Sequence, residues 1–117
     1  MAFGRAICVL ALTLLPIAAA AGEYETDLRH CLDQSIAPER RADACTGLLA
    51  SGRLPAEAFG ETLSFRGVAL AAMGRYDEAV RDYEAAARLD PRLAEGCGSI
   101  ADLLAAARLA LERAKGS

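Results

Sequence analysis

The residues of this chain with the greatest capacity for chemistry are one histidine and four cysteines. His30, Cys31, Cys45 and Cys97 include the ligand types of a zinc site, and the cysteines could also act as thiols. No Cys-x-x-Cys pair occurs, however, and His30 and Cys31 are adjacent, so on a helix their side chains point in different directions. We therefore expect no metal and no cofactor, and keep a thiol or metal-binding protein as the alternative reading.

The other polar residues do not predict an enzyme or a nucleic-acid binder. A Ser/His or Cys/His relay needs a well-placed histidine, and His30 is the only one in the chain. The carboxylates are scattered over what would be solvated helix faces, and no glycine-rich phosphate loop follows a strand. With 13 Lys+Arg against 16 Asp+Glu the net charge is -3, and no stretch is strongly basic. A non-catalytic protein with a protein partner is the expectation.

Residues 1–21 have the features of a secretory signal peptide. Arg5 precedes an uncharged run over residues 6–20, which is shorter than the roughly 20 apolar residues that span a bilayer. The run ends in small residues that a signal peptidase accepts, and acidic residues follow at once. Cleavage here would leave residues 22–117 as a periplasmic or secreted domain without a stable membrane anchor.

Two of the cysteines are spaced for a disulfide in such an oxidising compartment. Cys31 and Cys45 are 14 residues apart, and the turn expected near Pro38 lies almost midway between them. Their side chains can therefore meet across an antiparallel helical hairpin. We predict a Cys31–Cys45 disulfide, with Cys97 as a free or intermolecular thiol. Three buried thiols are the alternative, because cysteine also packs as a small hydrophobic residue.

Helices are the elements expected to position these residues. The chain is 54% hydrophobic but only 5% aromatic, with no Trp, which favours close-packed helices with Ala and Leu at their contacts. No segment alternates with a period of two. Turn signals and apolar spacing predict an all-α chain of about five helices in antiparallel hairpins. They cover residues 24–33, 38–51, 56–73, 76–89 and 92–113, with Ser99 as a fresh cap if the start of the last helix frays.

The stretch at residues 60–93 combines small residues, tyrosines and a proline at regular spacing. Gly67 and Ala79 lack bulk where two helices would touch, and Gly74 lets the chain reverse between them. The full set is Gly67, Gly74, Tyr76, Ala79, Tyr83, Ala86 and Pro91. In these residues and their spacing the stretch resembles one tetratricopeptide repeat.

This resemblance implies a domain organisation and a function. A divergent hairpin at 24–51 would precede the repeat and a capping helix at 92–113 would follow it. Members of the family bind peptide segments on a concave face formed by the first helix of each repeat, which implies a protein-interaction module or adaptor. Carried onto this chain, the partner-binding face consists of Glu61, Ser64, Val68, Ala71, Arg92 and Leu93. We expect Val68 and Ala71 to be exposed there; an ordinary solvated face is the alternative.

The last helix offers a second candidate surface. Between residues 99 and 111 only Asp102 and Arg108 are charged, whereas a terminal repeat normally presents a polar outer face. Leu109 and several alanines are left over from the stripe that would face the core. These extra apolar residues either have no function or form a contact with a partner, which includes self-association as a homodimer.

Overall fold

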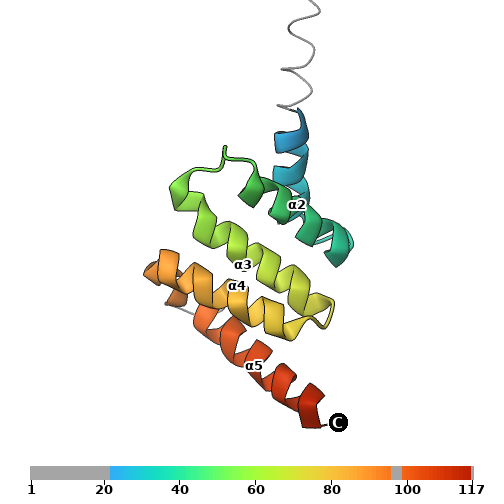
Figure 1. Cartoon of the computed structure of the whole chain (residues 1–117), viewed down its shortest axis with the longest axis vertical. Helices are drawn as coiled ribbons and strands as arrows, with labels where there is room; N and C mark the ends of the chain where they lie inside the picture. The colour runs from blue at the N-terminus through green and yellow to red at the C-terminus, as the bar shows by residue number, and fades with distance from the viewer. Residues whose placement is uncertain (1–21, 96–98, 117) are drawn as a thin grey trace, which may run out of the picture.

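The chain is helical along most of the residues that the computed structural model describes, 22–95 and 99–116. In order, the elements are a helix at residues 22–32, α2 (Pro38–Ala50), α3 (Ala56–Ala72), α4 (Tyr76–Leu89), the 3₁₀ turn η1 (Pro91–Ala94) and α5 (Ile100–Gly116). Figure 1 shows α2 to α5 side by side in chain order, with each helix packed against the next. The predicted all-α class of helical hairpins is confirmed. The signal peptide predicted at residues 1–21 lies outside the described residues.

Short local signals set the ends of these helices. Pro38 opens α2 in the first turn, where its missing N–H would have had no helical partner. After α3, Gly74 adopts φ 79°, a left-handed conformation that favours glycine. The Arg75 amide then donates to the Leu70 carbonyl at 2.9 Å, which satisfies a carbonyl at the end of α3. The chain reverses here, so α3 and α4 run antiparallel.

The α3–α4 hairpin is held by a close approach at Gly67. A Cβ at this position would lie 2.6 Å from Cε1 of Tyr83, so only glycine lets the aromatic ring rest against α3. Tyr83 is 1% exposed, and Ala79 and Ala86 on the same helix are fully buried. The core cluster around this contact comprises Leu70, Ala79, Tyr83, Ala86, Ile100 and Ala107, and we call it the repeat core.

The first hairpin, formed by residues 22–32 and α2, has a smaller core with a covalent link. Cys31 and Cys45 form the predicted disulfide, with 2.09 Å between the sulfurs and 4.9 Å between the Cα atoms. Both are buried together with Ala44 and Leu48, and we call these four residues the disulfide core. Phe65 of α3 packs against this cluster, which joins the first hairpin to the repeat.

The last helix begins later than the sequence predicted. We expected it to start near Arg92, but residues Pro91–Ala94 form a 3₁₀ turn and α5 starts at Ile100. The Asp90 carboxylate accepts a hydrogen bond from the Arg92 amide at 3.2 Å, which stabilises the short turn. The Ser99 hydroxyl accepts from the Asp102 amide at 3.4 Å, so the alternative cap that the sequence offers is the one in place. Two glycines at 96 and 98 lower the helix propensity between the two elements.

We find no helix in residues 22–95 and 99–116 with the length and apolar character needed to cross a membrane.

Candidate functional site

Helix α3 presents two faces with different chemistry. Because successive residues turn by 100°, Glu61 and Arg66 point about 140° apart around the helix. On one side lies a surface pocket of about 330 Å³, lined by Glu61, Ser64, Phe65 and Leu93, which we call the open-face pocket. On the other side, around Arg66, lies a second pocket of about 290 Å³. In the second pocket Arg66 pairs with Asp82 and Arg75 pairs with Glu78, whereas no ion pair of the described residues involves Glu61.

The open-face pocket lies between the two cores. Phe65 packs against the disulfide core, whereas Leu93 packs against the repeat core. Leu93 is held over α3 because Gly60 leaves room for it: a Cβ at Gly60 would be 3.2 Å from Cδ1 of Leu93. The walls are thus fixed by packing on both sides, while Glu61 is exposed at the rim and Ser64 is half-buried. Such a pocket can receive an apolar side chain without rearrangement of the helices.

The structure divides the partner-binding face predicted from the sequence. Glu61, Ser64 and Leu93 come together at the open-face pocket. Val68 and Ala71 do not have the exposure we expected: both are half-buried and pack against the repeat core. This expectation was wrong because both side chains pack against the cluster that contains Leu70 and Tyr83, which covers part of their surface. Their role in binding stays a prediction.

Phe65 is the lining residue that the sequence analysis missed. The partner-binding face predicted from the sequence included Glu61, Ser64 and Leu93 but not Phe65. The available signal was its position four residues after Glu61, which places both side chains on the same side of α3. Its second contact, with the disulfide core, depends on a pairing of distant segments that no local pattern shows.

Arg92, the remaining residue of the predicted face, is engaged by its neighbour. Its Nε and Nη2 donate to the two carboxylate oxygens of Asp90, at 3.0 and 3.1 Å. The side-chain hydrogen bond from Arg92 lowers the pKa of Asp90, and the same bond raises the pKa of Arg92. Both residues line a pocket of about 280 Å³ next to the open-face pocket, together with Ala56, Glu57, Gly60 and Leu89.

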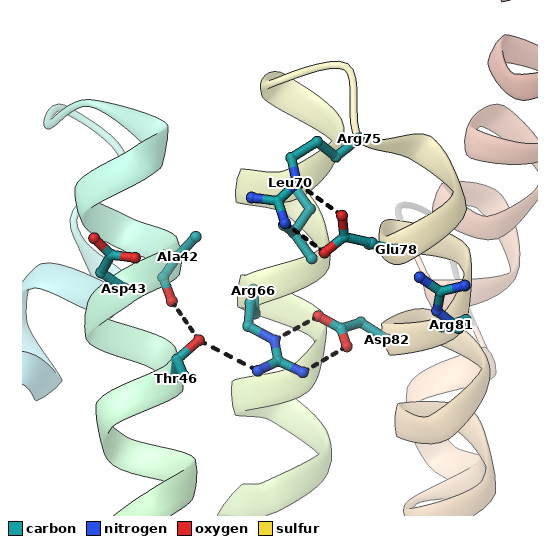
Figure 2. A pocket seen from close by; sticks show the side chains of 9 residues that line it. All are labelled: Ala42, Asp43, Thr46, Arg66, Leu70, Arg75, Glu78, Arg81 and Asp82. Carbon is teal, nitrogen blue, oxygen red and sulfur yellow. Dashed lines mark hydrogen bonds and ion pairs between the residues drawn. The ribbon is translucent and has the colours of Figure 1, made fainter.

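The charged pocket on the other face is a structural network (Figure 2). Nε and Nη2 of Arg66 donate to the two carboxylate oxygens of Asp82, at 2.7 and 2.8 Å. Nη1 donates to the Thr46 hydroxyl at 3.3 Å, so a single guanidinium links α3 to both α2 and α4. The hydrogen bond to Asp82 raises the pKa of Arg66. Since these polar groups bind one another, we assign this pocket to stability.

The thiol and metal alternative receives no support from the described cysteines. Cys31 and Cys45 are joined to each other and at most 1% exposed, so neither sulfur is a free ligand. Across the described ranges we find no group of three or more His, Cys, Asp or Glu side chains placed to hold a metal ion. Cys97 lies outside the described residues.

The surface of α5 retains one large apolar residue. Leu109 is 54% exposed, whereas Ile100 and Ala107 of the same helix are buried against α4. Arg108 beside it bonds to Glu84 of α4, with 3.2 Å between Nη2 and Oε2. The outer surface of α5 therefore has one exposed large apolar side chain, Leu109.

Comparison with known proteins identifies the segment that carries the open-face pocket. Residues 60–93 match the family model of the tetratricopeptide repeat. The match contains all four lining residues, and it runs from within α3 through α4 to η1. No curated protein and no solved structure shows significant similarity to the chain. Repeats of this family generally bind other proteins and are not catalytic. The chain therefore contains one clear tetratricopeptide repeat, at residues 60–93.

Proposed function

We propose that the protein is a non-catalytic interaction module that binds a peptide or helix of another protein at the open-face pocket. The observation that carries this proposal is the pocket itself, whose walls Phe65 and Leu93 are fixed by the two cores. It lies on the first helix of the repeat, the element from which members of the family bind peptides. The predicted residues Glu61 and Ser64 line it.

The proposal includes export. A signal peptide at residues 1–21 would deliver the domain to the periplasm or the medium, and the Cys31–Cys45 disulfide is of a kind that persists in such compartments. Intact-mass measurement on protein recovered from its native host tests this step. We expect a mature chain that begins at Ala21 or Gly22. A full-length species extracted from the membrane would contradict it.

Site-specific photo-crosslinking tests the binding surface. A photoreactive amino acid at Ser64 would sit in the open-face pocket, and the same residue at Arg81 would sit in the charged pocket on the other face. In the native host we expect a discrete adduct with another protein from position 64 and none from position 81. Equal labelling from both positions, or no adduct from position 64, would contradict the proposed site.

Self-association through α5 is the second candidate, supported by the 54% exposure of Leu109. Sedimentation equilibrium of the wild-type protein and a Leu109→Ser variant tests it. A dimer that the substitution converts to monomer would support this surface as an interface. A wild-type protein that is monomeric at high concentration would exclude it.

A further inference from the structure

The rim of the open-face pocket is predominantly acidic. Glu57 and Glu61 are exposed and one helical turn apart on α3, and Asp90 lies beside them. The basic group among the lining residues here is Arg92, and two of its nitrogens already bond to Asp90. Glu61 adds only a longer-range attraction to it. Among the ion pairs of the described residues, none involves Glu57 or Glu61, so neither carboxylate has a direct basic partner at this rim.

Apolar side chains alternate with these carboxylates. Phe65 and Leu93 line the open-face pocket on one side of Glu61. On the other side, the neighbouring pocket is lined by Leu89, which is 59% exposed, together with Glu57. A pocket of about 330 Å³ lies at the lower end of the range for small-molecule sites, roughly 300–1,000 Å³, and therefore suits one inserted side chain. Across this surface, apolar side chains are therefore flanked by acidic groups.

We propose that the occupant is a basic and apolar segment of a partner protein. One apolar side chain enters between Phe65 and Leu93, and a Lys or Arg about one helical turn away on the segment meets Glu57 and Glu61. This inference rests on the proposed function and adds the chemistry of the ligand to it. The apolar anchor supplies most of the affinity, because exposed ion pairs contribute little each. The carboxylates select the sign of the partner's charge and speed its association.

The chain offers a matched control for the charges. Glu39 and Asp43 are also exposed acidic residues one turn apart, and they lie on α2. Glu39 occupies the first turn of its helix, as Glu57 does in α3. The pair Glu39→Gln/Asp43→Asn therefore changes net charge and helix-terminus electrostatics as Glu57→Gln/Glu61→Gln does, but on another helix. Ser64→Trp, which fills the open-face pocket, tests the anchor; circular dichroism confirms that each variant is folded.

A random peptide library displayed on phage is the probe. We expect the wild-type protein and the α2 control to enrich peptides with an apolar residue close to Lys or Arg. Synthetic versions of these peptides should bind Glu57→Gln/Glu61→Gln roughly fivefold more weakly at low ionic strength, with less difference at high salt. Peptides selected on that variant should keep the apolar residue and lose the basic one. Ser64→Trp should weaken binding by about tenfold or more, because the anchor no longer fits.

The outcomes separate this inference from the proposed function. Enriched peptides that are acidic or have no charge preference, but lose binding to Ser64→Trp, would overturn the ligand chemistry and leave the binding site standing. Peptides that bind Ser64→Trp as well as the wild type would overturn the site and both proposals with it. The absence of any enrichment would do the same. A wild-type dimer that Ser64→Trp dissociates would identify a second copy as the occupant and overturn the inference.

Discussion

The two helical hairpins of this protein are held together by different interactions. The first hairpin buries the four residues of the disulfide core and is closed by the Cys31–Cys45 bond. The α3–α4 hairpin has no covalent link in its core and relies on the fit of Tyr83 against Gly67. The segment that matches the repeat therefore contains, in Gly67 and Tyr83, the residues that pack its two helices together. The segment before it lacks that pattern and has a cross-link instead.

The open-face pocket depends on both hairpins. Phe65 lines the pocket and packs against the disulfide core, and Leu93 lines the pocket and packs against the repeat core. On the other face of α3, Arg66 adds a polar link from Asp82 of α4 to Thr46 of α2. Changes that loosen either hairpin should therefore alter binding as well as stability.

Removal of the disulfide should have the largest effect and should act on the first hairpin. Cys31→Ala/Cys45→Ala releases a loop with a sequence separation of 14, which lowers the free energy of unfolding by about 3 kcal/mol in the loop-entropy model. Because the disulfide core contains few other large side chains, the helix at residues 22–32 should detach first. Urea denaturation measures the total effect, and hydrogen exchange locates it.

Hydrogen exchange also measures the control for this prediction. In the double variant, amides of residues 22–50 should lose protection while those of α4 keep most of theirs. Cys97→Ala keeps the Cys31–Cys45 bond and should reproduce the wild-type pattern in both hairpins. Equal loss of protection in α4 would mean that the two hairpins unfold as one unit, and the proposed contrast between them would be wrong.

The repeat core should be the part of the protein most sensitive to alkaline pH. Burial, with a smaller effect from the Asp82 carboxylate, raises the pKa of Tyr83 from the ordinary 10.0 to about 12. The unfolded chain loses the phenol proton before the folded protein does. The stabilisation is therefore complete below about pH 10 and is lost between about pH 10 and 12, an effect of about 2–3 kcal/mol.

Tyr83→Phe tests this pH dependence, since it keeps the ring and removes the ionisable group. In urea titrations across this range, the variant should lose less stability between pH 10 and 12 than the wild type does. Tyr76→Phe, which changes a less buried tyrosine, should leave the wild-type fall in place. An identical fall in Tyr83→Phe and wild type would show that another group causes it.

The two hairpins also differ in how far the sequence predicts them. Gly67, Gly74 and Tyr83 determine the α3–α4 hairpin through local spacing, so its helices and its turn could be predicted closely. The Cys31–Cys45 pair was predictable because its turn lies between the two residues. The contact of Phe65 with the disulfide core was not, since it joins segments whose relative placement depends on packing of the whole stack.

The start of the last helix and the exposure of the binding face show the same limit. Pro91 and the glycines in the sequence after it are compatible with a late start of the last helix. Where this helix begins depends on the hydrogen bonds that Asp90 accepts from the Arg92 amide and Ser99 accepts from the Asp102 amide. Helical spacing placed Val68 on the same stripe as Glu61, yet spacing does not show how far neighbouring elements cover that stripe. Leu93 lies at the pocket because its side chain packs against α3 at Gly60, where a Cβ would be 3.2 Å from its Cδ1.

Gly67→Ala should destabilise the repeat core. The new Cβ would lie 2.6 Å from Cε1 and 2.9 Å from Cδ1 of Tyr83, and the buried ring has little room to move. Because the clash is with a buried ring, we expect an overpacking cost in the upper part of the usual range, about 2–3 kcal/mol, against the roughly 1 kcal/mol that alanine gains in a helix. We expect a net loss of about 1–2 kcal/mol in urea denaturation. In a Tyr83→Leu background the penalty should shrink, and an equal penalty in both backgrounds would contradict the assigned contact.

Gly47→Ala makes the same substitution in α2 of the first hairpin and should have the smallest effect, with the opposite sign. A Cβ there would lie 2.5 Å from Oδ2 of Asp27, which is the end of a flexible, half-buried side chain. Asp27 and Gly47 line a surface pocket of about 290 Å³, so the carboxylate has space to rotate away. The gain in helix propensity then dominates, and urea denaturation should show a stabilisation of about 0.5–1 kcal/mol. A destabilisation that Asp27→Ala relieves would instead mean that this hairpin is packed as tightly as the repeat.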